Sequence, residues 1–300
     1  MRSLAELVAE ARDTLLAGGV PPDEAAGDAE VLARHALNWD LTRWTLGRRD
    51  PPPADFSKHY DVLISRRLQR EPVSQIVGHR EFWGLDFEVT RDVLTPRPET
   101  ELVVQAALDR CRADNWSPSV VVDIGTGSGC IVVALATELP DSRFIASDAS
   151  LAALTVARRN AARHGVAHRI AFLHTAMIPP ENDVSIIVAN PPYVPLTLRD
   201  SLAPEVREYE PDSALFGGVD GLEYYRELLH WSTATALVES GWLIVEVGYD
   251  QAGAVKTLAD SLDWDPGGSY RDLQGIERVL TFRARHRFLE TIEDTDAEEE

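Results

Sequence analysis

From Ser119 onward the chain alternates short runs of β-branched and aliphatic residues with longer stretches of helical periodicity. The run SVVVDIG precedes the helical stretch CIVVALATEL, and RFIASD precedes LAALTVARRNAARHG. RIAFLH, VSIIVAN and GWLIVEVG continue the runs, with a helix expected from about Glu223 to Val238 before the last of them. This alternation predicts a mostly parallel, doubly wound α/β sheet with right-handed crossovers. Ligands of such sheets bind at the carboxyl ends of the strands.

The N-terminal part of the chain shows helical periodicity instead. Ser3 and Glu6 fit a capping box at the start of a first helix, and a second helix is expected from about Asp23 to Leu37. A short third helix is expected from about Asp40, and a fourth around Phe56. These segments predict a small helical bundle of the size of an accessory domain.

The periodicity changes from helical to alternating after Pro72. Arg80–Thr90, with a central glycine, predicts a β-hairpin. The expected organisation is therefore a helical domain over residues 1–71, a hairpin connector over 72–98 and an α/β domain over 99–287. The remaining residues, 288–300, are rich in acids with little to pack, and we expect them to be disordered.

Composition excludes several classes of protein. No stretch approaches the roughly 20 apolar residues of a membrane span, and the N-terminus MRSLAELVAEARD lacks the apolar run of a signal peptide. Two cysteines are too few for a disulfide framework or a cysteine zinc site, and the histidines lack metal-ligand spacing. The net charge of −20 argues against tight non-specific binding to nucleic acid. We therefore expect a cytoplasmic protein without a metal site, a membrane segment or direct nucleic-acid binding.

The stretch VVDIGTGSGC places three glycines between a strand and a helix. Gly125, Gly127 and Gly129 let the backbone turn sharply and approach a ligand closely, with helix N–H groups exposed. Asp148 ends the next strand, 19 residues after Gly129. A carboxylate in that place can accept hydrogen bonds from both hydroxyls of a ribose. A nucleoside-containing ligand is therefore expected.

The spacing of the loop argues against a dinucleotide. It is Gly-x-Gly-x-Gly rather than the Gly-x-Gly-x-x-Gly of the pyrophosphate fingerprint. Asp123 precedes the loop, where its charge would be poorly placed beside a pyrophosphate and well placed beside a sulfonium. The loop therefore favours S-adenosylmethionine over NAD.

A second motif, IIVANPPYVP, interrupts a buried strand with an amide and two prolines. Ile186–Val188 reads as the strand, which must end at Pro191 because proline donates no ladder hydrogen bond. The side-chain oxygen of Asn190 and the carbonyl of Pro191 are two fixed acceptors, able to hold both N–H groups of a planar nitrogen and aim its lone pair. Pro192 stiffens the turn, and Tyr193 is expected to stack on a planar group. In-line methyl transfer to such a nitrogen depends mainly on positioning.

Two further residues lie beside these motifs in the sequence. Cys130 directly follows the glycine loop, and we expect it to pack inside the helix rather than to act as a nucleophile. Glu246 ends the strand WLIVEV, where it either faces the pocket or has a structural role.

The motif Asn-Pro-Pro-Tyr after the fourth strand, together with GHREFWGLDFEV, LTPRPETE and RDLQGIERVL, resembles the bacterial peptide chain release factor N5-glutamine methyltransferases. The resemblance covers Ser3 to about Phe282. It implies a Rossmann-like class I methyltransferase fold with a partner-binding helical domain. It also implies an activity: methyl transfer from S-adenosylmethionine to the glutamine side-chain amide in the Gly-Gly-Gln motif of class I release factors, which modulates translation termination.

The resemblance also implies roles for individual residues. Asn190 to Tyr193 would hold the glutamine amide, with Asn190 and Pro191 catalytic, and Pro96 to Thr100 would line the cofactor pocket. After the third strand, relatives carry an aspartate and a bulky aromatic near the adenine, where this chain has Ala176 and Met177. Asp183 or a backbone carbonyl would then contact the adenine amine. The implied cofactor-binding residues are Gly125, Thr126, Gly127, Ser128, Gly129, Asp148 and Asn190.

Two other functions compete with this interpretation. The same motif serves amino methyltransferases that act on adenine N6 or guanine N2 of nucleic acids, whose target base is flipped out of the stack. The net acidity of the chain and the lack of a basic target-recognition domain count against that alternative. A non-catalytic module that binds S-adenosylmethionine is disfavoured by the intact Asn190–Tyr193 motif.

Overall fold

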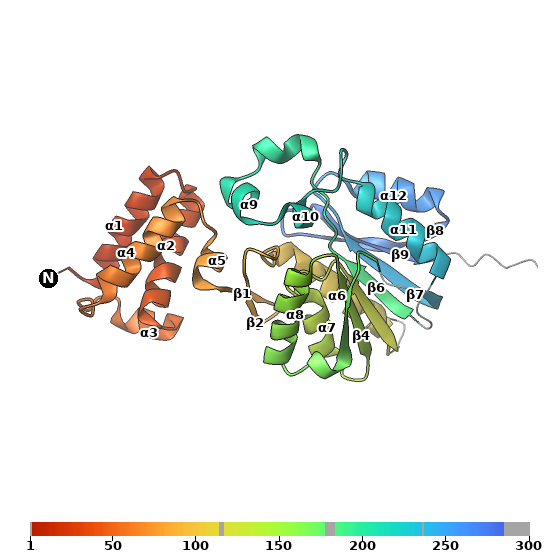
Figure 1. The fold of residues 1–300 in the computed structure, drawn as a ribbon, viewed down its shortest axis with the longest axis horizontal. Helices are drawn as coiled ribbons and strands as arrows, with labels where there is room; N and C mark the ends of the chain where they lie inside the picture. The colour runs from red at the N-terminus through yellow and green to blue at the C-terminus, as the bar shows by residue number, and fades with distance from the viewer. Residues whose placement is uncertain (1, 114–116, 178–183, 236, 285–300) are drawn as a thin grey trace, which may run out of the picture.

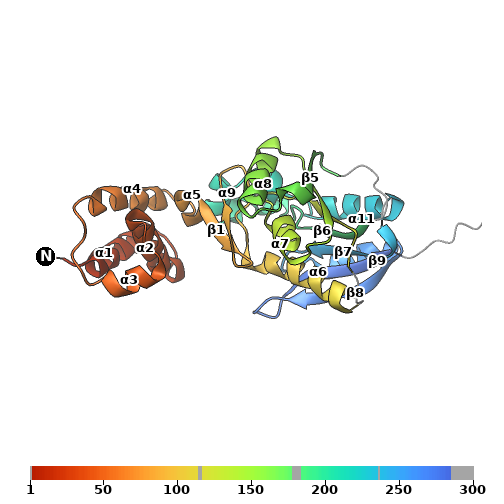
Figure 2. The ribbon, with the colours of Figure 1, turned by 90° about the horizontal axis from the view of Figure 1, so that it is seen from below.

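The fold has a helical N-terminal part that stands beside a larger α/β part (Figure 1). The view from below shows that helix α5 and strand β1 lie where the two parts meet (Figure 2). The computed structural model describes residues 2–113, 117–177, 184–235 and 237–284. The acidic segment expected to be disordered, 288–300, lies outside the described residues. Every helix within the described ranges is too short or too polar to traverse a lipid bilayer.

The N-terminal part is a bundle of helices around its own apolar core. Its main helices are α1 (Leu4–Ala17), α2 (Pro22–Leu37), α3 (Leu41–Gly47) and α4 (Phe56–Leu68). The capping box is confirmed, because the Ser3 backbone N–H donates to the Glu6 carboxylate at 2.7 Å and the Glu6 N–H donates to the Ser3 hydroxyl at 3.3 Å. Leu15, Leu32 and Tyr60 are among the buried residues that hold the helices together.

The connector contains the expected hairpin and one helix that the periodicity does not predict. Strands β1 (His79–Phe82) and β2 (Leu85–Glu88) pair antiparallel across Trp83 and Gly84, which both have positive φ angles, 55° and 71°. The extra helix, α5 (Val73–Val77), begins after Pro72 and ends where Gly78 takes a φ of 83°. A five-residue helix is too short for periodicity to reveal, since it spans little more than one turn.

The α/β part is built on a mixed sheet. Within the described residues seven strands pair in the order β5-β4-β3-β6-β7-β9-β8, with parallel pairing from β5 to β7 and antiparallel pairing of β9 with both its neighbours. The predicted doubly wound sheet is therefore confirmed. The strands are β3 (Val120–Ile124), β4 (Arg143–Asp148), β5 (Ile170–His174), β6 (Val184–Ala189), β7 (Leu237–Glu246), β8 (Trp264–Arg271) and β9 (Glu277–Ala284).

Helices cover both faces of the sheet, as alternate strand residues require. Val121 and Ile186 belong to the core on the face covered by α6 (Glu101–Ala113) and α7 (Cys130–Glu138), with α8 (Leu151–Arg163) beside them. Val122 and Ile187 belong to the core on the other face, covered by α11 (Glu223–Thr235) and α12 (Ala252–Ser261). Cys130 is buried at the start of α7, as expected.

The boundary between α11 and β7 differs from the sequence prediction. The helix expected to run to Val238 ends at Thr235, and Leu237 already pairs with Val184 at the start of β7. The pairing then shifts register before Ile186 meets Trp242. Helical periodicity did not reveal this boundary, because pairing with β6 makes the segment a strand.

A long excursion between β6 and β7 crosses the carboxyl end of the sheet. It contains the 3₁₀ turn η3 (Leu196–Ser201) and the short helices α9 (Pro204–Tyr209) and α10 (Asp212–Leu215). Figure 1 shows α9 between the helical bundle and the sheet. The Gln75 side chain on α5 donates to the Tyr209 carbonyl at 2.9 Å, which ties the excursion to the connector.

One buried arginine joins the excursion to the bundle. Arg67 on α4 is 2% exposed and forms ion pairs with Asp28 at 2.6 Å, Glu24 at 2.9 Å and Glu205 at 2.7 Å. Glu205 also pairs with Arg70 at 2.7 Å. Burial acts to raise the pKa of Glu205, but hydrogen bonds from Arg70 and Arg67 outweigh it and hold that pKa below its usual value. The carboxylate therefore stays charged between two parts of the molecule.

Candidate active site

A cavity opens at the point where the strand order of the sheet reverses. The chain passes from the central strand β3 to β4 on one side, and β6 lies on the other side of β3. The carboxyl ends of β3 and β6 therefore flank a crevice of the kind in which doubly wound sheets bind ligands. Residues that follow β3, β4 and β6 line this cavity together with part of the connector and of α10.

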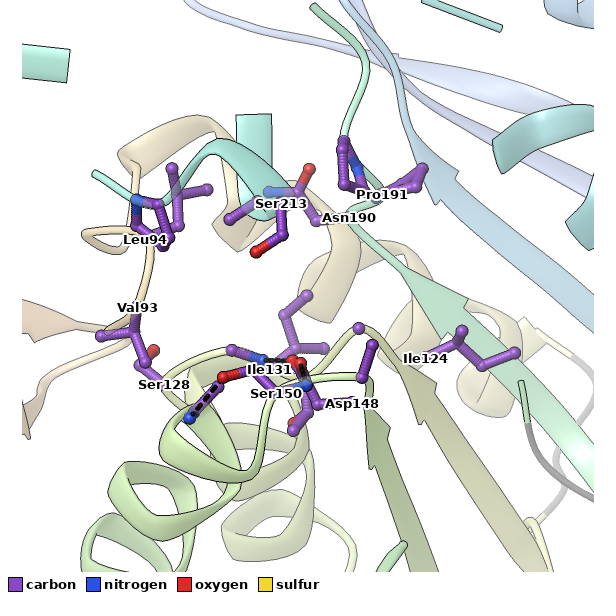
Figure 3. A pocket seen from close by; sticks show the side chains of 18 of the residues that line it. Val93, Leu94, Ile124, Ser128, Ile131, Asp148, Ser150, Asn190, Pro191 and Ser213 are labelled. Atoms are coloured by element: carbon purple, nitrogen blue, oxygen red, sulfur yellow. Dashed lines mark hydrogen bonds between the residues drawn. The ribbon is translucent and has the colours of Figure 1, made fainter. Parts of the chain in front are cut away.

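The lining divides into two sides that face each other across the cavity (Figure 3). The glycine side comprises Gly125–Ser128 with Asp148 and Ser150. The asparagine side comprises Asn190, Pro191, Pro192, Thr100, Arg97 and Ser213. Figure 3 shows Asn190 and Ser213 on one side and Ser128, Ser150 and Asp148 on the other. The two sequence motifs thus meet at one cavity.

The glycine loop adopts a conformation that side chains would resist. Gly125, Gly127 and Gly129 have φ angles of 72°, 54° and 82°. The N–H groups of Gly125 and Thr126 donate to the Ser147 carbonyl at 2.9 Å, which holds the loop against β4. Gly129 does not line the cavity; an added Cβ there would lie 3.1 Å from the Ala157 Cβ on α8. Its place in the motif therefore reflects close packing of two helices rather than contact with a ligand.

Asp148 holds the loop and faces the cavity at the same time. Its Oδ2 accepts from the Gly127 N–H at 2.9 Å, and its Oδ1 accepts from the Ser150 N–H at 2.8 Å. Each carboxylate oxygen keeps a further lone pair. Asp148 can therefore still accept from two hydroxyl groups of a ligand, as the sequence predicts.

Asp123 lies elsewhere than the sequence argument assumes. Its side chain is fully buried and does not line the cavity. Oδ2 accepts from the Thr126 hydroxyl at 2.6 Å, and Oδ1 has no hydrogen-bond partner among the described residues. Burial raises the pKa of Asp123 to about 7. The expectation that it meets a sulfonium is therefore wrong in its geometry, since Asp123 supports the loop from behind.

A residue that the sequence analysis did not single out ties the loop to the connector. Asn160 on α8 is fully buried, and its side-chain N–H₂ group donates to the Ser128 carbonyl at 2.9 Å and to the Glu88 carbonyl at 3.1 Å. Its oxygen accepts from the Glu88 N–H at 2.8 Å. The only signal in the sequence is an amide on an otherwise apolar helix face, which does not reveal its partners.

On the asparagine side, the amide of Asn190 is held by one specific partner. Its Nδ2 donates to the Thr100 hydroxyl at 3.1 Å, and Thr100 lies where the 3₁₀ turn η1 (Pro98–Thr100) leads into α6. Pro191 and Pro192 both line the cavity. From the segment expected to line the pocket, Pro96, Arg97 and Thr100 do so.

Tyr193 is the member of the motif that does not line the cavity. Its hydroxyl donates to the Glu246 carboxylate at 3.3 Å, and its ring packs beside the apolar core under α11 and α12. Burial raises the pKa of Tyr193 well above its usual value. The stacking face predicted for Tyr193 is therefore not presented to the cavity, because the strand end turns the ring towards Glu246.

The excursion after β6 completes the lining. Pro211, Ser213 and Ala214 contribute from α10 and the residue before it. The segment is fixed by Glu210, which accepts from Arg97 at 2.6 Å across 113 positions of the chain. No motif or periodicity marks these residues in the sequence, since their place depends on a contact between distant segments.

Ala176 and Met177, which stand where relatives carry an aspartate and a bulky aromatic, lie in different surroundings. Ala176 lines the cavity, whereas Met177 packs against the core under α11 and α12. Asp183, one candidate for the adenine contact, lies outside the described residues.

Family models and curated relatives match most of the chain. The family described as PrmC N-terminal domain matches residues 6–78, and the family described as Methyltransferase small domain matches residues 102–201. The release factor glutamine methyltransferase of Cereibacter sphaeroides is 42% identical over 90% of this chain and 94% of its own length. That of Burkholderia pseudomallei is 42% identical over 84% of this chain and 90% of its own length.

A solved structure supports the fold alone. The hMettl16 catalytic domain, crystallised in complex with the MAT2A 3′UTR hairpin 6, aligns with a TM-score of 0.56 at 15% identity. The alignment covers 75% of this chain and 82% of that chain. The shared architecture extends over most of both molecules.

Proposed function

The chain belongs to the family of release factor glutamine methyltransferases, and we propose that it methylates the glutamine of the Gly-Gly-Gln motif in class I peptide chain release factors. The methyl group comes from S-adenosylmethionine and is transferred to the side-chain amide nitrogen. The observation that carries the proposal is the meeting of the glycine side and the asparagine side at one cavity. A cofactor held by one side would lie within reach of an amide held by the other.

The glycine side has the groups that an adenosyl moiety requires. Asp148 retains acceptor capacity for ribose hydroxyls, and the open space above Gly125 and Gly127 lets a ligand approach the backbone. Bound there, S-adenosylmethionine supplies an electrophilic methyl group on its sulfonium. Ala176 leaves room beside the base.

The asparagine side has the groups that an amide nitrogen requires. The nitrogen of a glutamine side chain is a poor nucleophile because its lone pair is delocalised into the carbonyl. Asn190 Oδ1 and the Pro191 carbonyl accept its two N–H groups, which holds the nitrogen and aims the lone pair at the methyl group. After transfer the nitrogen loses one proton to solvent and returns to a neutral amide.

We further propose that the helical domain, residues 1–71, binds the release factor and that the enzyme acts in the cytoplasm, where its substrate works. The match of residues 6–78 to the PrmC N-terminal domain family supports this binding role, because the domain accompanies the methyltransferase domain in the family. The net charge of −20 supports a protein substrate over nucleic acid.

The test is transfer of a labelled methyl group by the purified full-length protein. The substrates are a class I release factor, the same factor with the Gly-Gly-Gln glutamine replaced by leucine, and duplex DNA and RNA. We expect label in the unmodified release factor alone. Label in nucleic acid only would instead identify an adenine or guanine amino methyltransferase. Bound cofactor without label in any substrate would identify a non-catalytic module.

A further inference from the structure

The two ends of the Asn190 side chain are not equivalent for the proposed reaction. A glutamine amide N–H₂ group needs an acceptor, so the Asn190 oxygen must face the cavity and its N–H₂ group must point away. The structure has this orientation, with Nδ2 donating to Thr100 Oγ1 at 3.1 Å. What keeps the amide from turning over is therefore a question about Thr100.

A threonine hydroxyl has one proton to donate and lone pairs to accept with. Thr100 could hold either end of the Asn190 amide, because it could donate to the oxygen as well as accept from the nitrogen. Thr100 is 2% exposed, so bulk water does not decide the direction of its proton. A neighbour that only accepts would decide it.

Glu246 is that neighbour. It ends β7, and because Ala189 pairs with Val245 in the parallel ladder, Glu246 lies beside the strand end that carries Asn190. The carboxylate is 2% exposed. Oε1 accepts from the Tyr193 hydroxyl at 3.3 Å, and Oε2 has no partner among the residues that the structure describes. Burial raises the pKa of Glu246 to about 7, and its neighbours Thr100 and Tyr193 act in the opposite direction.

We propose that Glu246 and Thr100 are positioning residues that fix the orientation of the Asn190 amide. Above about pH 7 the carboxylate is ionised and only accepts hydrogen bonds, so the Thr100 hydroxyl directs its proton to Glu246, whose Oε2 has no other partner among the described residues. The Thr100 oxygen is then left as an acceptor, which binds the Asn190 nitrogen and turns the Asn190 oxygen towards the cavity. We call the chain of contacts from Glu246 through Thr100 to Asn190 the relay. This inference rests on the proposed function, since it assigns the relay a task in holding the glutamine amide.

The experiment compares isosteric variants in the full-length enzyme. Thr100→Val removes the hydroxyl and keeps the shape, whereas Thr100→Ser keeps the hydroxyl. Glu246→Gln keeps the shape but introduces an N–H₂ group that can donate to Thr100 and compete with Asn190. Each variant is assayed for turnover on the release factor, KM for the release factor, the Kd of S-adenosylmethionine and the melting temperature.

We expect Thr100→Val to lower kcat by about 10- to 100-fold, the range of one lost buried hydrogen bond. Thr100→Ser should restore kcat to within about 3-fold of the wild type, and Glu246→Gln should lower it by about 10-fold. The Kd of the cofactor should change by less than about 3-fold in all three, because the relay does not touch the glycine side.

The matched control is Tyr225→Phe. The Tyr225 hydroxyl is buried and donates to the main-chain carbonyl of Glu246 at 2.8 Å, so the variant removes a hydrogen bond to the same residue outside the relay. It should lower the melting temperature and leave kcat within about 2-fold. Wild-type kcat in Thr100→Val, or losses of kcat in Thr100→Ser and Tyr225→Phe as large as the loss in Thr100→Val, would overturn the relay alone. A wild-type enzyme that does not methylate the release factor would overturn the proposed function and the relay with it.

Discussion

The glycine side and the asparagine side of the cavity are built in different ways. The glycine side is held by contacts within one stretch of chain, from Asp123 to Asn160, and most of them use main-chain groups of the loop. The asparagine side depends on side chains from distant segments, with Asn190 held by Thr100 across 90 positions. A local backbone frame therefore faces a frame that exists only when the whole domain is folded. The two sides should respond differently to substitution.

The largest difference is expected at Asn190. Asn190→Ala removes an acceptor that holds the reacting nitrogen, so kcat on the release factor should fall by about 10³-fold or more. The Kd of S-adenosylmethionine should rise by no more than about 10-fold, because Asn190 is only one of the groups around the cofactor. Single-turnover kinetics and calorimetry measure the two quantities. Unchanged turnover would contradict the role of Asn190.

The complementary substitution is Asp148→Ala on the glycine side. It removes the acceptor for ribose hydroxyls and the tie to the Gly127 N–H at 2.9 Å. The Kd of the cofactor should rise by about 100-fold, while kcat at saturating cofactor should fall by less than about 10-fold. Asp148→Asn, which keeps one acceptor oxygen, is the control and should show a smaller rise. If Asp148→Ala lowered kcat alone, the division between the two sides would be wrong.

Two glycines of the loop, Gly129 and Gly127, should separate a packing role from a role in ligand binding. Gly129 has a φ of 82°, and Gly129→Ala would place a Cβ 3.1 Å from the Ala157 Cβ. The free energy of unfolding should therefore fall by about 2 kcal/mol. Gly127→Ala meets no atom within 4 Å and has only the backbone strain, about 1 kcal/mol. Its Cβ lies on the cavity lining, so it should weaken cofactor binding as well. Urea denaturation with and without cofactor measures both; equal losses of stability would contradict the packing role of Gly129.

The last difference concerns the stability of the fold behind the glycine side, at Asp123, and depends on pH. Because burial raises its pKa from 3.8 to about 7, the folded state binds a proton more tightly than the unfolded state. Its contribution to stability is therefore fully present below about pH 4 and is lost as the pH rises to about 7. Asp123→Asn lacks this loss, so its melting temperature should gain on that of the wild type as the pH rises from about 4 to about 7. A difference that stays constant with pH would show that Asp123 is ionised in the fold at low cost.

What the sequence predicts follows the same division. The sequence predicts the loop, Asp148 and the doubly wound sheet, because each depends on neighbours in sequence and on strand periodicity. The sequence does not predict the direction in which a side chain at a strand end points. Asp123 was therefore expected in the cavity, and Tyr193 was expected to present its ring there. Burial of Asp123 behind the loop and the contact of Tyr193 with Glu246 depend on residues far along the chain.

Thr100 illustrates the limit most clearly. The segment Pro96–Thr100 was expected at the pocket from the family resemblance, and three of its residues do line the cavity. Its bond to Asn190 has no local signal, since a threonine before a helix is an ordinary N-terminal residue. The position of Ser213 has no local signal for the same reason, since its segment is fixed by the pairing of Arg97 with Glu210, which spans 113 positions.

The ion cluster around Arg67 has a consequence for how this protein can be rearranged. Arg67 forms ion pairs with carboxylates of the bundle and of α9. If the bundle or the α/β part were exchanged alone, some of these charged groups would lose their partners. Leaving a buried charge without its partner costs about 3–5 kcal/mol. The bundle is therefore not a portable module. In a chimera with another enzyme, four residues would have to be transferred together: Glu24, Asp28, Arg67 and Glu205.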